Sequence, residues 1–293
     1  MRIGIVILPD QRWAEAGRRW RLADEWGFDH AWTYDHLGWR DLVDGPWFDA
    51  VPTLTAAAAV TTRIRLGTYV ATPNFRHPVH FARETTAADD ISGGRLILGL
   101  GAGGTGFDSA VLGRPEMTPR DRVGRFAEFL ELLDTILRQP ATTWTGTWYS
   151  AVDARSIPGP VQQPRPPFVV AANGPRAMRL AARHGDGWVT TGPQAETAEE
   201  WWREVAAIHG RFQDAVGAVG RTGPVDRYLN LDTSPVFSLS SVGAFTDAVG
   251  RAAELGFTDV ITHWPRESSW YAGDEKVLEA VVAELPRLQQ DFG

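Results

Sequence analysis

An acid and an imidazole stand side by side early in the chain, at Asp35 and His36. They follow Trp32-Thr33-Tyr34, an aromatic stretch with a β-branched residue that is typical of a buried strand. A histidine just past a strand end can hydrogen-bond a ligand or carry a proton near neutral pH. The sequence therefore predicts catalytic roles for His36 and Asp35. The alternative is a structural pair, in which His36 caps a loop and Asp35 binds an arginine.

Glycine-rich or polar segments follow three further predicted strands. Glycines of the stretch 99–106, Gly103 among them, let a backbone lie against a flat ligand. The segment Ala172-Asn173-Gly174 leads into Pro175, and the N–H groups at such a helix start favour an anion such as phosphate. Thr72, at another strand end, can hydrogen-bond a ligand. Each segment also has a plain structural interpretation, as a connector, a capped turn or a strand end.

A strand-then-helix pattern repeats about eight times and must position these segments. The predicted strands cover residues 3–8, 31–34, 65–72, 96–100, 168–171, 187–191, 228–231 and 260–262. The predicted helices cover 13–26, 48–60, 77–91, 120–137, 175–182, 198–215, 242–255 and 275–288. This alternation predicts the α/β class and a single-domain (β/α)8 TIM barrel over residues 1–293, whose chemistry lies where strands end. An open doubly wound sheet fits the same spacing, but Pro9-Asp10-Gln11 replaces the glycine fingerprint expected after its first strand.

Two stretches interrupt the pattern, at about 102–118 and 140–167. The second contains Trp144, Trp148 and Tyr149 and ends in a run rich in proline. We expect a hairpin followed by a crossing loop there, because long barrel insertions commonly serve as lids or binding loops.

The amino-acid composition argues against several classes of binding partner and of catalytic chemistry. The net charge of −7 argues against nucleic acid and anionic membranes, and no apolar run has the length of a membrane span. The absence of cysteine excludes thiol catalysis, and the histidine spacing predicts no metal site. Lys276 is the single lysine, which argues against Schiff-base chemistry. The N-terminus has no signal-peptide pattern, so we expect a cytoplasmic protein with a small-molecule substrate.

Five segments together resemble the bacterial luciferase-like family of flavin and deazaflavin oxidoreductases. The segments are Trp32-Thr33-Tyr34-Asp35-His36, residues 66–73 (Leu66-Gly67-Thr68-Tyr69-Val70-Ala71-Thr72-Pro73), residues 95–103, residues 171–175 and Gly185-Asp186-Gly187-Trp188. The resemblance implies a barrel with a tricyclic cofactor across the C-terminal ends of its strands, and a homodimer.

The branch that uses coenzyme F420 has a Ser/Thr-Asp-His type motif at the end of the second strand, where this chain has Tyr34-Asp35-His36. By that similarity His36 would lie beside the deazaflavin ring, and a non-proline cis peptide would fall between Tyr69 and Val70. The resemblance assigns the cofactor site to Trp39, Tyr69, Val70, Thr72, Gly103, Ala172, Asn173 and Gly174.

The implied activity is hydride transfer between coenzyme F420 and a small organic substrate. One departure concerns Gly104, which stands where deazaflavin-dependent sugar-phosphate dehydrogenases have a glutamate proton donor, and Asp108 is a substitute only by its nearness in sequence. The sugar-phosphate substrate is therefore not carried over. Two alternatives stay open: an FMN-dependent monooxygenase supplied by a separate flavin reductase, and a non-catalytic flavin-binding barrel.

Overall fold

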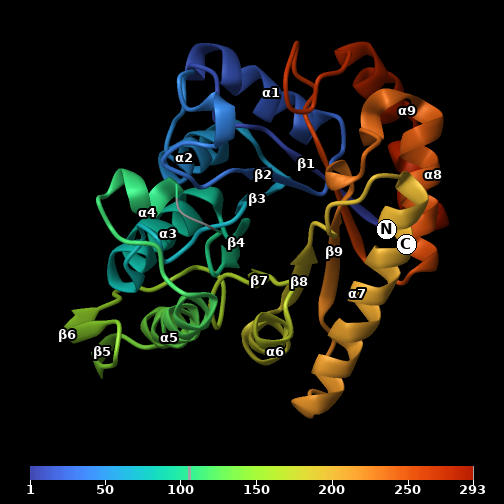
Figure 1. The fold of residues 1–293 in the computed structure, drawn as a ribbon. Coiled ribbons are helices and arrows are strands. Elements are labelled where there is room, and N and C mark those ends of the chain that lie inside the picture. Colours follow the sequence, from blue (N-terminus) through green and yellow to red (C-terminus); the bar gives the residue numbers. More distant parts are fainter. Residues whose placement is uncertain (105–106, 293) are drawn as a thin grey trace.

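Eight parallel strands close into a barrel in the computed structural model, which describes residues 1–104 and 107–292 (Figure 1). Around the barrel the order is β1, β10, β9, β8, β7, β4, β3 and β2. The strands are β1 (Arg2–Val6), β2 (His30–Thr33), β3 (Arg65–Thr68), β4 (Leu96–Gly101), β7 (Phe168–Ala171), β8 (Gly187–Thr190), β9 (Asp226–Asn230) and β10 (Asp259–His263). Each strand therefore pairs with its neighbour along the chain, apart from the inserted β5 and β6, and the predicted barrel is confirmed.

Helices cover the outside of the barrel and connect its strands (Figure 1). They are α1 (Trp13–Glu25), α2 (Ala50–Val60), α3 (Pro78–Ser92), α4 (Phe107–Val111), α5 (Pro119–Arg138), α6 (Pro175–His184), α7 (Ala198–Ala218), α8 (Val242–Glu254) and α9 (Glu275–Asp291). Single 3-10 turns lie at Arg40–Leu42, Leu231–Thr233 and Ser238–Ser240. No helix among the described residues has the length and hydropathy needed to cross a bilayer.

The insertion after α5 forms the predicted hairpin, β5 (Ala141–Thr145) with β6 (Ser150–Arg155). Its turn is tied to α5 by the Glu128 carboxylate, which accepts hydrogen bonds from the backbone N–H groups of Thr147, Trp148 and Tyr149. The earlier insertion holds the short helix α4. Thr105 and Gly106, at the end of the predicted glycine-rich loop, lie outside the described residues.

Strand β3 ends at Thr68, earlier than the predicted end at Thr72. Beyond it the Tyr69–Val70 peptide bond is cis, as predicted, and the chain rejoins the sheet only at a bridge between Ala71 and Leu100. The loop that carries Thr72 thus starts at the barrel rim.

Side chains alternate between two cores along each strand, as the pleat requires. One core packs strands against helices, and the other contains no helix residues and fills the barrel interior. The interior core holds Val6, Leu8, Trp32, Tyr34, Tyr69, Ile97, Val169, Val189, Tyr228 and Ile261. Because Tyr34 and Tyr69 lie just past the ends of β2 and β3, this core continues to the face where barrel chemistry takes place.

Candidate active site

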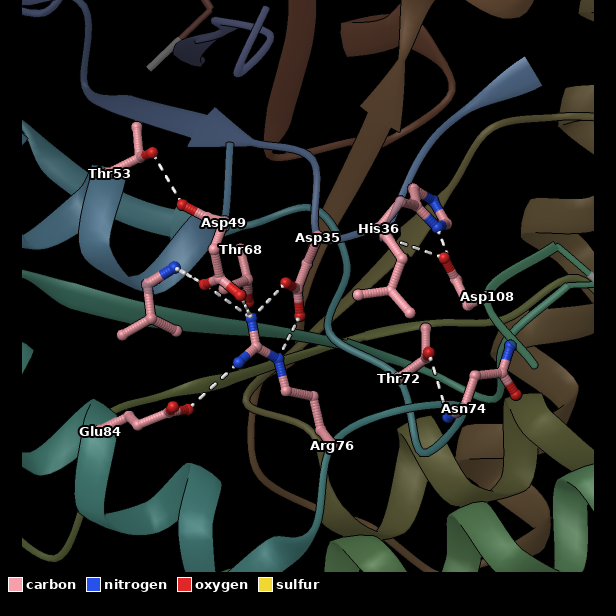
Figure 2. A network of polar contacts seen from close by, with 12 residues as sticks. Asp35, His36, Asp49, Thr53, Thr68, Thr72, Asn74, Arg76, Glu84 and Asp108 are labelled. Carbon is pink, nitrogen blue, oxygen red and sulfur yellow. Dashed lines mark hydrogen bonds and ion pairs between the residues drawn. The ribbon is translucent and has the colours of Figure 1, made fainter. Parts of the chain in front are cut away.

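His36 lies just past the end of β2 and is held by an acid from the helix α4 (Figure 2). Its Nδ1 atom is 2.9 Å from Oδ2 of Asp108, whose other oxygen accepts a hydrogen bond from the N–H of Leu37 at 2.9 Å. The Asp108 side chain is 4% exposed and the His36 side chain 26%. Because an ionised carboxylate only accepts hydrogen bonds, Nδ1 carries the proton of this contact, and in the neutral form of the ring Nε2 is then an acceptor. Within the described residues Nε2 has no partner, which leaves it for a ligand.

Asp35 points away from His36 toward Arg76 (Figure 2). Its two oxygens accept hydrogen bonds from the guanidinium at 2.7 and 3.2 Å, and both side chains are buried. Arg76 also binds Asp49 at 3.0 Å and Glu84 at 3.2 Å. Burial alone would lower the pKa of Arg76, but its hydrogen bonds to Asp35 and Asp49 and their negative charges raise it overall. The structure thus brings Asp35 into an ion-pair cluster that fixes the loop, and a direct catalytic role for it stays a prediction.

The loops after β3 and β4 meet at Thr72, Asn74 and Gly103. Thr72 is buried, and its Oγ1 accepts a hydrogen bond from the N–H of Asn74 at 3.3 Å (Figure 2). Gly103 has a φ of +81°, and a Cβ there would come within 2.5 Å of the Asn74 side chain. Only glycine fits such a close approach in this backbone conformation. The predicted cofactor residues Thr72 and Gly103 therefore lie on adjoining loops.

Aromatic rings line the barrel mouth beside His36. The rings of Tyr34 and Tyr69 are stacked with centroids 6.0 Å apart, and Trp39 packs edge-on against Tyr34 at 5.2 Å. Val70 packs against the same cluster. The Tyr69 hydroxyl is buried without a hydrogen-bond partner among the described residues; Asn230 is near it but not in hydrogen-bonding geometry. A buried hydroxyl without a partner marks a position that a ligand could satisfy.

The third predicted segment, Ala172-Asn173-Gly174, links β7 to α6. Thr190 donates a hydrogen bond to the Asn173 side-chain oxygen at 2.6 Å, so Asn173 is bound to the end of β8. Gly174 is the N-cap of α6 and offers no side chain to the first-turn N–H groups, and a Cβ at Gly174 would meet nothing within 4 Å. This helix start is therefore an uncapped site with positive character.

A groove of about 360 Å³ runs beside this helix, between α5, α6 and the hairpin turn. Its cationic side chains are Arg120, Arg176, Arg179 and Arg183. None of the four forms an ion pair within the described residues. Asp121 is the acid of the lining, so the groove carries net positive charge along α6, from Arg176 in its first turn to Arg183 in its last.

Sequence reasoning missed a second histidine at the same barrel face, one that is fully buried. His263 ends β10 and bonds to Asp232 and to the hydroxyl of Tyr34. His263 could have been found in the sequence by the same feature as His36, because it too is a histidine at the end of a predicted strand. The described residues contain no group of three His, Asp or Glu side chains suited to a metal ion.

Comparisons with known proteins show which proteins this chain is similar to. Residues 1–226 match the sequence profile of the luciferase-like monooxygenases. The chain is 40% identical over 315 aligned positions to an F420-dependent glucose-6-phosphate dehydrogenase from Beutenbergia cavernae, covering 92% of this chain and 91% of that protein.

Two solved structures share the fold. A coenzyme F420-dependent tetrahydromethanopterin reductase from Methanopyrus kandleri has a TM-score of 0.78 at 19% identity, covering 98% of this chain and 99% of that one. A monooxygenase from Streptomyces bottropensis has a TM-score of 0.76 at 21% identity, covering 100% of both chains.

Proposed function

Since the chain belongs to the luciferase-like monooxygenase family, we propose that it is an oxidoreductase that moves a hydride between bound coenzyme F420 and a small organic substrate. The observation that carries this proposal is the His36–Asp108 pair at the barrel mouth, with the Nε2 atom of His36 left for a ligand. The 40% identical F420-dependent relative favours the deazaflavin branch.

The residues of the mouth fit a deazaflavin. Trp39, Tyr69, Val70, Thr72 and Gly103 would hold the ring system, because they combine aromatic surface, a buried hydroxyl without a partner and a glycine loop. The bound cofactor supplies the hydride chemistry at its C5 carbon.

The other end of the cofactor would bind at α6. Ala172, Asn173 and Gly174 would hold its phosphate, because the uncapped helix start favours an anion and leaves room for one. The unpaired arginines of the neighbouring groove would stabilise further negative charge on the ligand.

The chain's own residues hold this site in shape. Asp108 orients His36, whose Nε2 would accept a hydrogen bond from the ligand. Asp35 and Arg76 anchor the loop that carries His36, and the aromatic rings exclude water from the reacting atoms.

The substrate is proposed only by class, as an alcohol or its carbonyl product, because the 40% identical relative is named as a dehydrogenase of glucose 6-phosphate. Gly104 is exposed, and a Cβ added there would meet nothing within 4 Å. The chain therefore places no acid at the position that the resemblance assigns to the proton donor of sugar-phosphate dehydrogenases.

An FMN-dependent monooxygenase is the second candidate, because the Streptomyces bottropensis monooxygenase matches the fold nearly as well as the F420-dependent reductase. Titration of the purified protein with coenzyme F420 and with FMN, followed by tryptophan fluorescence, separates the two. Tight binding of coenzyme F420 and its reduction by an alcohol without oxygen consumption would support the proposal. Binding of reduced FMN alone, with oxygen uptake, would overturn it.

The assembly and location are part of the same proposal. By family resemblance the protein would be a homodimer, and it would need a separate flavin reductase only if FMN is the cofactor. The cytoplasmic location is proposed as well. Light scattering on the purified protein measures the dimer directly, and a monomer mass would contradict it.

A further inference from the structure

A continuous series of hydrogen bonds runs from the barrel interior to its mouth through four residues, of which only Tyr34 also belongs to the aromatic cluster described above. The His263 Nδ1 atom is 2.8 Å from Oδ2 of Asp232, and its Nε2 atom is 2.9 Å from the hydroxyl of Tyr34. The Tyr34 hydroxyl is in turn 2.8 Å from that of Tyr271. The side chains of Asp232 and His263 are fully buried, Tyr34 is 6% exposed and Tyr271 is half-buried. Tyr271 is therefore the outermost residue of this hydrogen-bonded series.

The positions of the protons in this hydrogen-bonded series follow from the donors that surround the Asp232 carboxylate. The Asp232 carboxylate also accepts hydrogen bonds from the backbone N–H groups of Ser238 and His263 and from the Thr262 hydroxyl. Three donors thus surround the carboxylate besides Nδ1 of His263. An ionised carboxylate only accepts hydrogen bonds, so Nδ1 carries the proton of the contact with Asp232. Nε2 is then the acceptor for the Tyr34 hydroxyl, and Tyr34 accepts from Tyr271.

Hydrogen bonds donated from Tyr271 to Tyr34 and from Tyr34 to His263 require both phenols to be protonated near neutral pH. Burial raises the pKa of Tyr34 well above its usual value and raises the pKa of Tyr271 to about 12. Each hydroxyl can therefore donate inward while its oxygen stays open to a proton from outside.

The outer end lies against the proposed cofactor site. The Tyr271 ring stacks on His263 with centroids 3.6 Å apart and faces Trp39 at 6.2 Å. Its backbone has a φ of +62°, in the left-handed region that residues other than glycine rarely adopt. Such strain is found mainly where surrounding structure holds a functional side chain in place.

We propose that Tyr271, Tyr34 and His263 form a proton relay, positioned by Asp232, that exchanges the substrate's hydroxyl proton, an assignment that rests on the proposed function. During alcohol oxidation the C–H bond breaks and its electron pair leaves with the hydrogen as a hydride to the deazaflavin. The substrate O–H bond breaks and its proton binds the Tyr271 oxygen, whose own proton moves to Tyr34. The Tyr34 proton moves to Nε2 of His263, so both phenols end neutral and the imidazolium lies beside Asp232. Carbonyl reduction runs the same transfers in reverse.

The relay supplies the proton acceptor that the exposed Gly104 cannot provide. Tyr271 and Tyr34 are the catalytic residues in this assignment because they pass the substrate's proton, and Asp232 is a positioning residue. A purely structural network would instead hold the loop after β10 in place without entering the reaction.

The kinetic test compares Tyr271→Phe and Tyr34→Phe with the control Tyr228→Phe, which removes a phenol from the same barrel interior on the side of His30 and Trp32. The probes are propan-2-ol and glucose 6-phosphate with coenzyme F420, in a single turnover. We expect each relay variant to slow hydride transfer at least about tenfold and to abolish the solvent deuterium isotope effect, with unchanged cofactor affinity. Wild-type rates in the relay variants, or an equal loss in the control, would overturn the relay.

A second measurement needs neither cofactor nor substrate. Nitrogen-15 spectra of the histidines, assigned with His263→Gln, report which ring nitrogen of His263 is protonated. The relay requires a proton on Nδ1 alone, an Nε2 signal that shifts in Tyr34→Phe, and a displaced Nδ1–H signal in Asp232→Asn. A proton on Nε2 would overturn the relay, whereas failure to bind coenzyme F420 with the expected tautomer would count against the proposed function alone.

Discussion

Oδ2 of Asp108 lies 2.9 Å from Nδ1 of His36, so an acid that follows β4 orients an imidazole at the end of β2. The second Asp108 oxygen is bound to the N–H of Leu37, and the side chain is buried. Both oxygens are therefore engaged by the β2 loop. We infer that Asp108 serves to orient His36 and does not take the place of the acid missing at Gly104.

Replacing His36 by alanine is expected to weaken coenzyme F420 binding or turnover at least about tenfold, because a lost hydrogen bond to a ligand costs about 1–2 kcal/mol. The ring is partly exposed and packs edge-on at 6.2 Å against Tyr34, so the fold should stay intact. Fluorescence titration and circular dichroism measure the two effects separately. Unchanged affinity and rate in a folded variant would return His36 to a loop-capping role.

Asp108→Asn tests the orientation itself. An amide can present its N–H₂ group to the Nδ1–H of His36, so we expect a changed tautomer. Loss of the hydrogen bond to the carboxylate should weaken cofactor binding about tenfold, because a hydrogen bond to a charged group contributes about 1.5–3 kcal/mol. The matched control is Asp247→Asn, an exposed carboxylate on α8 with no hydrogen bond within the described residues. Nitrogen-15 spectra of His36 measure the tautomer, and titration with coenzyme F420 measures the cofactor affinity. The expectation fails if the tautomer and the affinity match those of the control.

The barrel was predictable because each of its strands and helices has a recognisable local sequence pattern. Short apolar runs such as Leu96–Gly101 alternate with helices that carry apolar residues at helical spacing, and glycines or prolines separate them. The cis bond between Tyr69 and Val70 was predicted from the resemblance of residues 66–73 to the F420-dependent branch. These signals lie within a few residues of one another in the sequence.

The partners of the site residues were not predictable in the same way. Asp35 binds Arg76, 41 positions away, and Asp232 binds His263, 31 positions away. Such pairs form because barrel closure brings separate loops to one rim, and no local spacing encodes which loops meet. The sequence marked Asp35 as an acid that could bind an arginine but could not identify Arg76.

Acid should destabilise the protein through Asp259 at the opposite end of the barrel. Asp259 is fully buried and binds Arg2 at 2.6 and 2.8 Å and His30 at 3.1 Å. Burial alone would raise the pKa of Asp259, but His30 and Arg2 lower it overall. A carboxyl whose pKa is lower in the folded state stabilises the fold above its unfolded pKa of about 3.9, and this contribution is lost as pH falls through the folded value.

Urea unfolding at about pH 7 and about pH 3 measures this contribution. We expect Asp259→Asn to lower the free energy of unfolding by about 3 kcal/mol at neutral pH, because it breaks a buried pair whose Arg2 partner is half-exposed. The difference between variant and wild type should shrink at low pH. A difference that is constant with pH would mean that Asp259 contributes through packing alone.

Gly174→Val tests where the cofactor phosphate binds. The backbone at Gly174 is extended, with φ −99° and ψ 154°, and a Cβ would meet nothing within 4 Å, so the chain itself tolerates valine. A phosphate on the first-turn N–H groups of α6 would instead be crowded by the added methyl groups. We expect affinity for coenzyme F420 to fall at least about tenfold, about 1.4 kcal/mol, while affinity for its phosphate-free deazaflavin analogue stays unchanged. Gly223→Val is the matched control, since it lies in a loop before β9 and its Cβ also meets nothing within 4 Å. Equal losses for both ligands would place the phosphate elsewhere, at the loops after β9 and β10, where many other barrels bind it.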